Sequence, residues 1–198
     1  YEGEYIIDIA KKVPDEDIDF AHFAADHILE DIRGDLKRFG VSFDNWVSEE
    51  EFFKRGIVDT ILKEFEKKGL IYPAEGSKWF KSSAYGDEKD RVVVKSDGSY
   101  TYLASDIAYH KYKIDRGYDT LVNIVGPDHH GYIPRLKAVV NVLGFNPEHL
   151  YFIIVQLTTL YRGKEKLSMS TRKGQFISLK QLMDEVGPDA SKFFFIFR

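Results

Sequence analysis

The sequence contains no cysteine, which excludes a disulfide framework and any metal site built from thiolates. It also lacks a run approaching the ~18 consecutive apolar residues that a membrane-spanning helix requires. The opening residues, YEGEYIIDIA, have neither the basic start nor the apolar core of a secretory signal. From these absences we expect a cytoplasmic protein without a membrane partner.

The overall composition is that of an ordinary globular protein. Hydrophobic residues make up 43% of the 198 positions and charged residues 30%, a balance that argues against intrinsic disorder. Acidic and basic residues are distributed unevenly along the chain. The first 70 residues carry 18 acids and 10 bases, whereas between Leu160 and Lys180 six bases stand against Glu165 alone. This basic stretch suits one anionic ligand, although composition alone favours a solvated hairpin tip.

The first third of the chain has helical periodicity. Apolar residues recur at steps of three and four through residues 17–39, which predicts one helix ending near Gly40. Ser48 and Glu51 have the spacing of a capping box, so a second helix is predicted from there to Gly69. Its buried side would consist of Phe53, Ile57, Ile61 and Phe65.

The sequence pattern changes after Tyr72-Pro73, and from Tyr102 onward helix and strand patterns alternate. Short strands are expected at 78–83 and 91–95, followed by helix 104–116, strand 120–125, helix 132–143 and strand 151–157. Two helical stretches, 179–185 and 189–197, end the chain. The alternation predicts an α/β fold with a parallel sheet, and the apolar 151–157 segment predicts a strand covered on both faces.

One candidate site is GPDHHGY, residues 126–132, which follows the strand ending at Val125. Ligands of open parallel sheets bind beyond the carboxyl ends of the strands. Gly126 would let a ligand lie against the backbone, and Asp128, His129 and His130 would surround it near a helix N-terminus. A helix cap by Asp128 with two incidental histidines explains the same residues equally well.

A second candidate site is KLSMSTRKGQF, residues 166–176, which is rich in hydroxyls and cations. Such a glycine-containing loop suits the binding of phosphates, although the Walker pattern GxxxxGK[ST] is missing. The side chains concerned are Ser168, Ser170, Thr171, Arg172 and Lys173.

A third candidate is the pair Tyr102 and Asp106. Residues four apart share one face of a helix, so the ring could pack along an alkyl stem while the carboxylate takes a cationic head. Taken alone, a helix-start carboxylate stabilised by the helix dipole is the simpler explanation of Asp106.

Together these segments resemble the catalytic domain of the arginyl-tRNA synthetases, a class I family. The order of DIAYH and MSTRKG makes the match highly specific. The resemblance extends over essentially the whole chain and rests on VSFDNWVSEE (41–50), KWFKSSAYGDEKDRVVVKSDGSYTYLASDIAYHKYK (78–113), IVGPDHHGYIPRL (124–136), MSTRKGQFISL (169–179) and GPDASKFFF (187–195).

The resemblance implies roles for individual residues. SMSTR at 168–172 stands where the family has its KMSKS loop, with Ser168 and Thr171 in place of the two lysines. The catalytic charge would then come from Arg172 and Lys173, with Lys166 as a further candidate. The implied arginine pocket consists of Tyr102, Asp106 and His129. The implied ATP site consists of Gly126, Asp128, His130, Ser168, Met169, Ser170, Thr171 and Arg172.

The resemblance also implies an organisation and an activity. Residues 1–75 would be a mainly helical connective insertion, and 76–198 the second half of a Rossmann-like catalytic domain. The expected activity joins L-arginine to tRNA(Arg) with ATP, and Mg²⁺ would arrive with the ATP rather than in a protein site. The family's HIGH motif is absent from these 198 residues, so this stretch by itself is expected to be inactive.

Two other functions fit parts of the sequence. A synthetase-like module that only binds a nucleotide or tRNA would also lack HIGH. The letters DHH at 128–130 also occur in a family of metal-dependent phosphoesterases, and two imidazoles with a carboxylate are plausible metal ligands. That site needs further aspartates in their own motifs, and none with convincing context is found.

Overall fold

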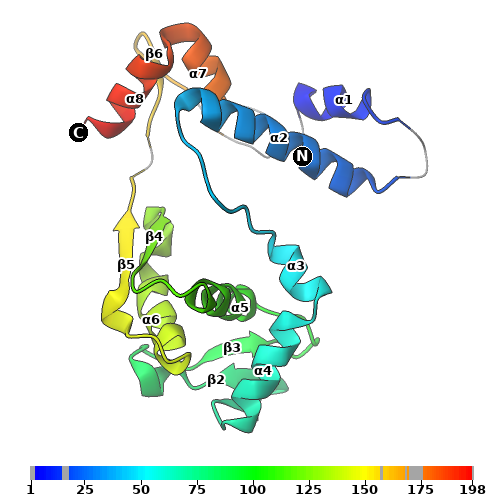
Figure 1. Ribbon diagram of the computed structural model, residues 1–198, viewed down its shortest axis with the longest axis vertical. Coiled ribbons are helices and arrows are strands. Elements are labelled where there is room, and N and C mark those ends of the chain that lie inside the picture. Colours follow the sequence, from blue (N-terminus) through cyan, green and yellow to red (C-terminus); the bar gives the residue numbers. More distant parts are fainter. Residues whose placement is uncertain (1–2, 15–17, 157, 168, 170–175, 198) are drawn as a thin grey trace. The chain divides into compact units, whose positions relative to one another are not determined.

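The computed structural model describes residues 3–14, 18–156, 158–167, 169 and 176–197 (Figure 1). It consists of two compact units, which are described separately. Unit 2 is the continuous segment Val47–Leu157, and unit 1 combines Tyr1–Trp46 with Thr158–Arg198. In the part of the chain that the structure describes, no helix is both long and apolar enough to cross a bilayer.

Unit 2 combines helices with two small sheets. Its strands are β1 (Ile71–Ala74), β2 (Ser77–Phe80), β3 (Arg91–Val94), β4 (Leu121–Val125) and β5 (Leu150–Ile154). Its helices are α3 (Glu49–Lys54), α4 (Ile57–Lys67), α5 (Tyr102–Asp115) and α6 (Ile133–Val142), with 3-10 turns η1 (Ser82–Tyr85), η2 (Pro127–Tyr132) and η3 (Pro147–His149). β1, β2 and β3 form an antiparallel sheet, and β4 pairs in parallel with β5. The mixed α/β class and the parallel pairing are therefore confirmed.

The parallel pair β4–β5 is covered on one face only within the described residues. Leu121 and Leu150 turn inward and pack with Leu136 and Val140 of α6. Within the described residues, strand 151–157 is not covered on both faces as predicted, because Tyr151 is 52% exposed and the next two outward positions are equally open. Alternate residues of a strand point to opposite faces, so α6 can bury only every second side chain.

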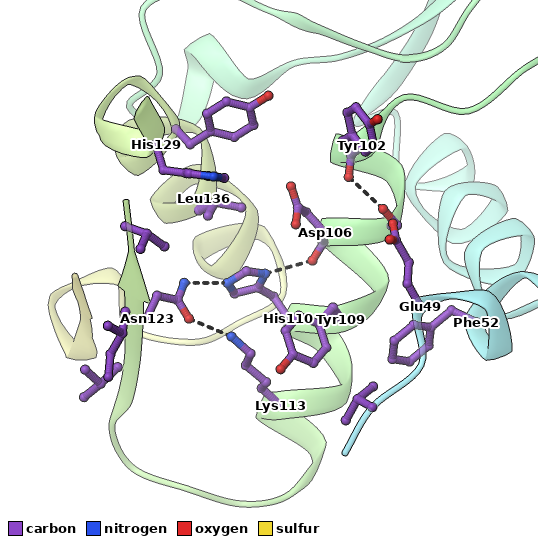
Figure 2. A pocket seen from close by; sticks show the side chains of 16 residues that line it. Glu49, Phe52, Tyr102, Asp106, Tyr109, His110, Lys113, Asn123, His129 and Leu136 are labelled. Carbon is purple, nitrogen blue, oxygen red and sulfur yellow. Dashed lines mark hydrogen bonds between the residues drawn. The ribbon is translucent and has the colours of Figure 1, made fainter. Parts of the chain in front are cut away.

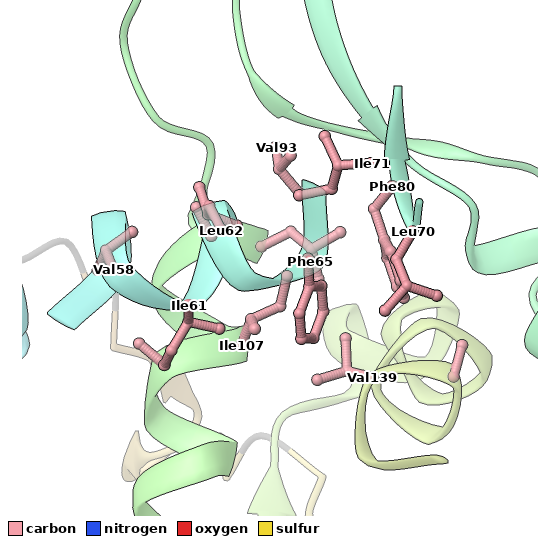
Figure 3. Packing of buried hydrophobic residues seen from close by; sticks show 14 of the residues in the cluster. Val58, Ile61, Leu62, Phe65, Leu70, Ile71, Phe80, Val93, Ile107 and Val139 are labelled. Carbon is pink, nitrogen blue, oxygen red and sulfur yellow. The ribbon is translucent and has the colours of Figure 1, made fainter. Parts of the chain in front are cut away.

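The main core of unit 2 lies where α4, α5 and α6 pack together with β2 and β3 (Figure 3). Phe65 of α4 and Phe80 of β2 have ring centroids 5.7 Å apart, and both rings are fully buried. Val93 of β3, Ile107 of α5 and Val139 of α6 complete the cluster, each with no exposed surface. Because Ile107 anchors α5 here, the opposite side of that helix is held in a fixed orientation.

The helix predicted from Ser48 to Gly69 is two helices, α3 and α4. Gly56 separates them with a φ of 62°, a left-handed conformation that glycine adopts without strain. Ser48 makes no side-chain capping bond, so the predicted capping box is wrong. The break changes the helical phase: Phe52 is buried instead of Phe53, while the buried positions of α4 include Val58, Ile61, Leu62 and Phe65.

The loop between β2 and β3 is held by a buried ion pair and by side-chain hydrogen bonds nearer the surface. Arg91 donates to Asp87 through Nε and Nη2, both at 2.7 Å, and the Asp87 side chain has no exposed surface. Asp90 accepts hydrogen bonds from Tyr72 and Ser83. This loop packs on α6 through η1, so its ion pair supports the helix behind the candidate site.

Unit 1 contains α1 (Glu4–Ala10), α2 (Phe20–Phe39), β6 (Tyr161–Arg162), β7 (Glu165–Lys166), α7 (Leu179–Val186) and α8 (Pro188–Ile196). Helix α2 ends as predicted at Gly40, which is left-handed with a φ of 78°. β6 and β7 form the expected hairpin. The functional division after residue 75 stays a prediction, because the two units are defined by packing and have other boundaries.

Candidate functional site

A cavity of about 810 Å³ lies within unit 2, beside one face of α5 and the strand β4 (Figure 2). The start of α3 and the turn η2 complete its wall. It is lined by Val47, Glu49, Phe52, Tyr102, Ser105, Asp106, Tyr109, His110, Lys113, Val122, Asn123, Ile124, Val125, His129, Tyr132 and Leu136.

The structure brings together the three residues of the expected arginine pocket. Tyr102 and Asp106 lie on the same face of α5, as their spacing predicts, and His129 faces them from η2. Figure 2 shows the Asp106 side chain pointing from α5 toward the side of His129 and Leu136. Tyr102 is 79% exposed, so it stands at the mouth of the cavity. The chemical roles of the three residues remain predictions.

Asp106 is a half-buried carboxylate with no direct partner among the residues that the structure describes. Burial raises its pKa, and the charge of Glu49 raises it further, while the cations Lys113 and Arg135 act in the opposite direction without cancelling the rise. Among the described residues no hydrogen bond or ion pair holds its side chain. Its two oxygens are therefore available to a ligand cation in the cavity.

The interpretation of Asp106 as a helix-start carboxylate is wrong. The helix begins at Tyr102 with Thr101 as its N-cap, and its first turn holds no acidic residue. Asp106 lies in the second turn, beyond the first-turn region where the dipole acts strongly on a side chain.

A chain of hydrogen bonds crosses the wall of the cavity, and no motif in the sequence indicated it (Figure 2). Lys113 Nζ donates to Asn123 Oδ1 at 2.6 Å, Asn123 Nδ2 lies 3.1 Å from His110 Nε2, and His110 Nδ1 lies 2.8 Å from the Asp106 carbonyl oxygen. A carbonyl only accepts, so Nδ1 carries the proton and Nε2 accepts from the amide. Burial of His110, with the nearby Lys113 cation, lowers its pKa to about 4, which keeps the ring neutral as this chain requires.

Lys113 is held in the same wall. Its Nζ lies 4.3 Å from the ring centroid of Tyr109, a favourable position for a cation. Burial lowers its pKa to about 8, although the charge of Asp106 opposes that change. The helical spacing of Tyr102, Asp106, Tyr109 and Lys113 marks one face of α5 and could have revealed the lysine. No local pattern marks Asn123, which arrives from β4.

The GPDHHGY segment follows β4 as predicted, with η2 spanning most of it. A Cβ placed on Gly126 would come within 2.7 Å of the Asp128 carboxylate, so this glycine leaves room for its neighbour's side chain. Asp128 is largely exposed and makes no capping hydrogen bond, which makes the helix-cap interpretation wrong. His129 lies 3.7 Å from Asp128, and His130 is exposed.

Most of the KMSKS-like segment lies outside the described residues. This applies to Ser168, Ser170, Thr171, Arg172 and Lys173, whereas Met169 is described and half exposed in unit 1. In the preceding hairpin Arg162 donates to Glu185 at 2.6 Å, so that base of the basic stretch has an acidic partner.

Within the described ranges, no three His, Cys, Asp or Glu side chains gather closely enough to hold a metal ion. The DHH letters at 128–130 therefore have no supporting ligand cluster there, and the phosphoesterase alternative gains nothing from the structure.

Comparison with known proteins identifies the family. Residues 5–193 match the family model described as tRNA synthetases class I (R), catalytic domain. The chain is 55% identical over 175 residues to an arginine–tRNA ligase of Hydrogenovibrio crunogenus, covering 88% of this chain and 30% of that protein. It is 46% identical over 211 aligned positions to an arginine–tRNA ligase of Syntrophotalea carbinolica, covering all of this chain and 38% of that protein. The chain thus spans about a third of the length of the curated relatives that it matches.

Solved structures agree. A Campylobacter jejuni structure described as an arginyl-tRNA synthetase matches all of this chain and 45% of its own, with 39% identity and a TM-score of 0.87. The Thermus thermophilus arginyl-tRNA synthetase shares the fold at 16% identity and a TM-score of 0.63, over 84% of this chain and 35% of its own. The chain therefore belongs to the arginyl-tRNA synthetase family, and residues 5–193 correspond to its class I catalytic domain.

Proposed function

We propose that the protein containing this chain is an arginine–tRNA ligase of translation, acting in the cytoplasm where its substrates occur. It activates L-arginine with ATP to arginyl-adenylate, releases pyrophosphate, and transfers the arginyl group to the 3′ end of tRNA(Arg). The observation that carries the proposal is Asp106, a carboxylate that has no partner among the described residues and lies in a cavity of this family's catalytic domain.

The cavity offers the features that a guanidinium side chain needs. The two oxygens of Asp106 match the donor fork of a guanidinium, which a compact ammonium cannot reproduce. Tyr102 at the mouth packs along the alkyl stem, and His129 forms the facing wall. Lysine is rejected on this geometry, because its single nitrogen cannot make the paired hydrogen bonds.

In this proposal ATP binds at the segment that follows strand β4, next to the arginine pocket. Gly126, Asp128 and His130 contact the nucleoside, and the loop carrying Ser168, Met169, Ser170 and Thr171 covers the phosphates. Mg²⁺ enters with the ATP. The arginine carboxylate attacks the α-phosphorus directly, so the protein contributes positioning and charge, with Arg172 and Lys173 as the catalytic cations. No side-chain nucleophile takes part.

The full-length protein should catalyse exchange between ATP and pyrophosphate that depends on L-arginine. Residues 1–198 alone should show none, because catalysis by positioning fails when half of the nucleotide site is absent. Radioactive pyrophosphate exchange at saturating arginine measures both. A full-length protein without arginine-dependent exchange would overturn the ligase proposal, and exchange by residues 1–198 would contradict the second expectation.

Arg172 and Lys173 should affect chemistry and not arginine binding. Replacing either with alanine in the full-length protein should lower the rate of adenylate formation by ~10–1,000-fold, as loss of a charge contact in the transition state commonly does. Rapid-quench kinetics measures that rate, and Lys164→Ala in the described hairpin is the matched control. A variant with weakened arginine affinity and an intact chemical step would show that these residues serve another site.

A further inference from the structure

The inner end of the cavity contains a cation that the proposed contacts with arginine leave unexplained. Asp106, His110 and Lys113 follow one another along the face of α5 that lines the cavity. A free lysine side chain samples many rotamers in water, and ordering one is entropically unfavourable. Lys113 is nonetheless held in one place, by Asn123 and by the ring of Tyr109.

Every hydrogen bond that fixes Lys113 has a defined direction. An ammonium only donates, so the oxygen of the Asn123 amide must face it, and the amide nitrogen must then face His110. Neutral His110 accepts that bond and donates its own N–H to the carbonyl of Asp106. This series of hydrogen bonds thus starts at the Lys113 ammonium and ends at the backbone carbonyl of Asp106. Through Asn123 it links the backbone of Asp106 to β4.

The charges around the Asp106 side chain come from four elements. Glu49 approaches from the start of α3 and opposes ionisation, as burial does. Lys113 of α5, His129 of η2 and Arg135 of α6 favour the charged form, and Lys113 has the largest influence of the three. His110 is neutral in the hydrogen-bonded chain, so it supplies no charge.

Lys113 favours the ionised form of the Asp106 carboxyl without binding to its oxygens. Within the described residues the two side chains form no ion pair within 4.0 Å, because the ammonium is bound to Asn123 instead. A direct ion pair would compete with a ligand cation for the same oxygens. A cation held nearby by a neutral amide stabilises the carboxylate and leaves both oxygens free.

We propose that Lys113 is a positioning residue for ligand recognition: anchored by Asn123 and Tyr109, its ammonium keeps the Asp106 carboxylate in the charged form that binds a cationic side chain. The inference rests on the proposed function only in naming arginine as the ligand. The effect on Asp106 itself can be measured without any ligand.

The test is a titration of the Asp106 carboxyl by NMR in the full-length protein labelled with ¹³C at aspartate carboxyl carbons. The Asp106 signal is identified by its loss in Asp106→Asn. Lys113→Gln keeps a donor for Asn123 but removes the charge, and Lys113→Arg keeps the charge. Lys113→Gln should raise the pH at which the Asp106 carboxyl is half titrated by about 0.5–1 unit, which is less than the loss of a cation in direct contact would cause. Lys113→Arg should leave this midpoint near the wild-type value. An unchanged midpoint in Lys113→Gln would overturn the proposal.

Calorimetric titration of L-arginine adds a functional measurement. At pH values below the midpoint of the Asp106 titration, Lys113→Gln should bind arginine about three- to tenfold more weakly than wild type. This factor follows from a shift of about 0.5–1 pH unit, because only the ionised carboxylate binds the cation. The difference should vanish toward pH 8. Equal weakening at every pH would indicate a merely structural role and contradict the proposal. A wild-type protein that binds no arginine at any pH would defeat the proposed function, while the carboxyl titration would still decide the role of Lys113.

Discussion

Asp106→Asn should weaken the binding of L-arginine to the full-length protein by about 2–5 kcal/mol and leave ATP affinity near wild type. The amide keeps the shape of the carboxylate but removes the charge, so the guanidinium is left desolvated without its partner. Wild-type affinity should also fall as the pH drops through the Asp106 pKa, which lies above its ordinary value, because only the ionised form binds the cation. The variant should lose this dependence.

Calorimetric titration of arginine and of ATP measures both effects. Asp115→Asn is the matched control, because Asp115 lies on the same helix but is 56% exposed and pairs with Lys111 outside the cavity. It should change neither affinity. Unchanged arginine binding in Asp106→Asn would remove Asp106 from recognition and place the specificity carboxylate in the part of the protein outside this chain.

The second large effect should come from Asp87→Asn, which breaks the buried pair with Arg91. Removing one partner of a buried ion pair costs about 3–5 kcal/mol, because the remaining charge loses its compensation. The Asp87 side chain is fully buried and the Arg91 side chain only 16% exposed, so solvent cannot replace the contact. The same Asp115→Asn variant breaks an exposed ion pair and should cost less than about 0.5 kcal/mol.

Urea unfolding followed by tryptophan fluorescence provides the measurement. Residues 1–198 contain two tryptophans, so in a Trp46→Phe variant of this stretch the signal comes from Trp79 of β2, which belongs to the same unit as Asp87. Burial by itself would raise the pKa of Asp87, but hydrogen bonds from Arg91 and its neighbours outweigh burial and lower it. The stabilisation is therefore complete above the unfolded pKa of about 3.9 and disappears as the pH falls through the lower folded value. A loss below 1 kcal/mol at pH 7 would show that the pair contributes little.

Local patterns were sufficient for several parts of the site. Residues four apart on a helix share a face, so spacing alone placed Tyr102 and Asp106 together. A glycine and polar residues directly after an apolar strand located the turn that carries His129. The left-handed Gly40 ended α2 as the sequence indicated.

Local sequence patterns gave wrong predictions where the structure depends on a contact between distant residues or on the backbone conformation of one residue. Apolar spacing continues through Gly56, so periodicity alone joined α3 and α4, although the backbone turns left-handed there. The apolar residues of β5 indicated burial on both faces, but hydrophobicity does not show which neighbour covers a side chain, and alternate residues remain open.

The sequence by itself determined the family, the alternation of strands and helices, and the helix face that carries Asp106, because motifs and periodicity are properties of neighbouring residues. Only the tertiary structure decided the surroundings of that carboxylate. Asn123 is ten residues from Lys113 and on a different element, and Glu49 is more than fifty residues from Asp106. Charge and hydrogen bonding act through space at a few ångströms, so the electrostatics of the cavity depend on which elements pack together, and this is settled by the shared core around Phe65 and Ile107.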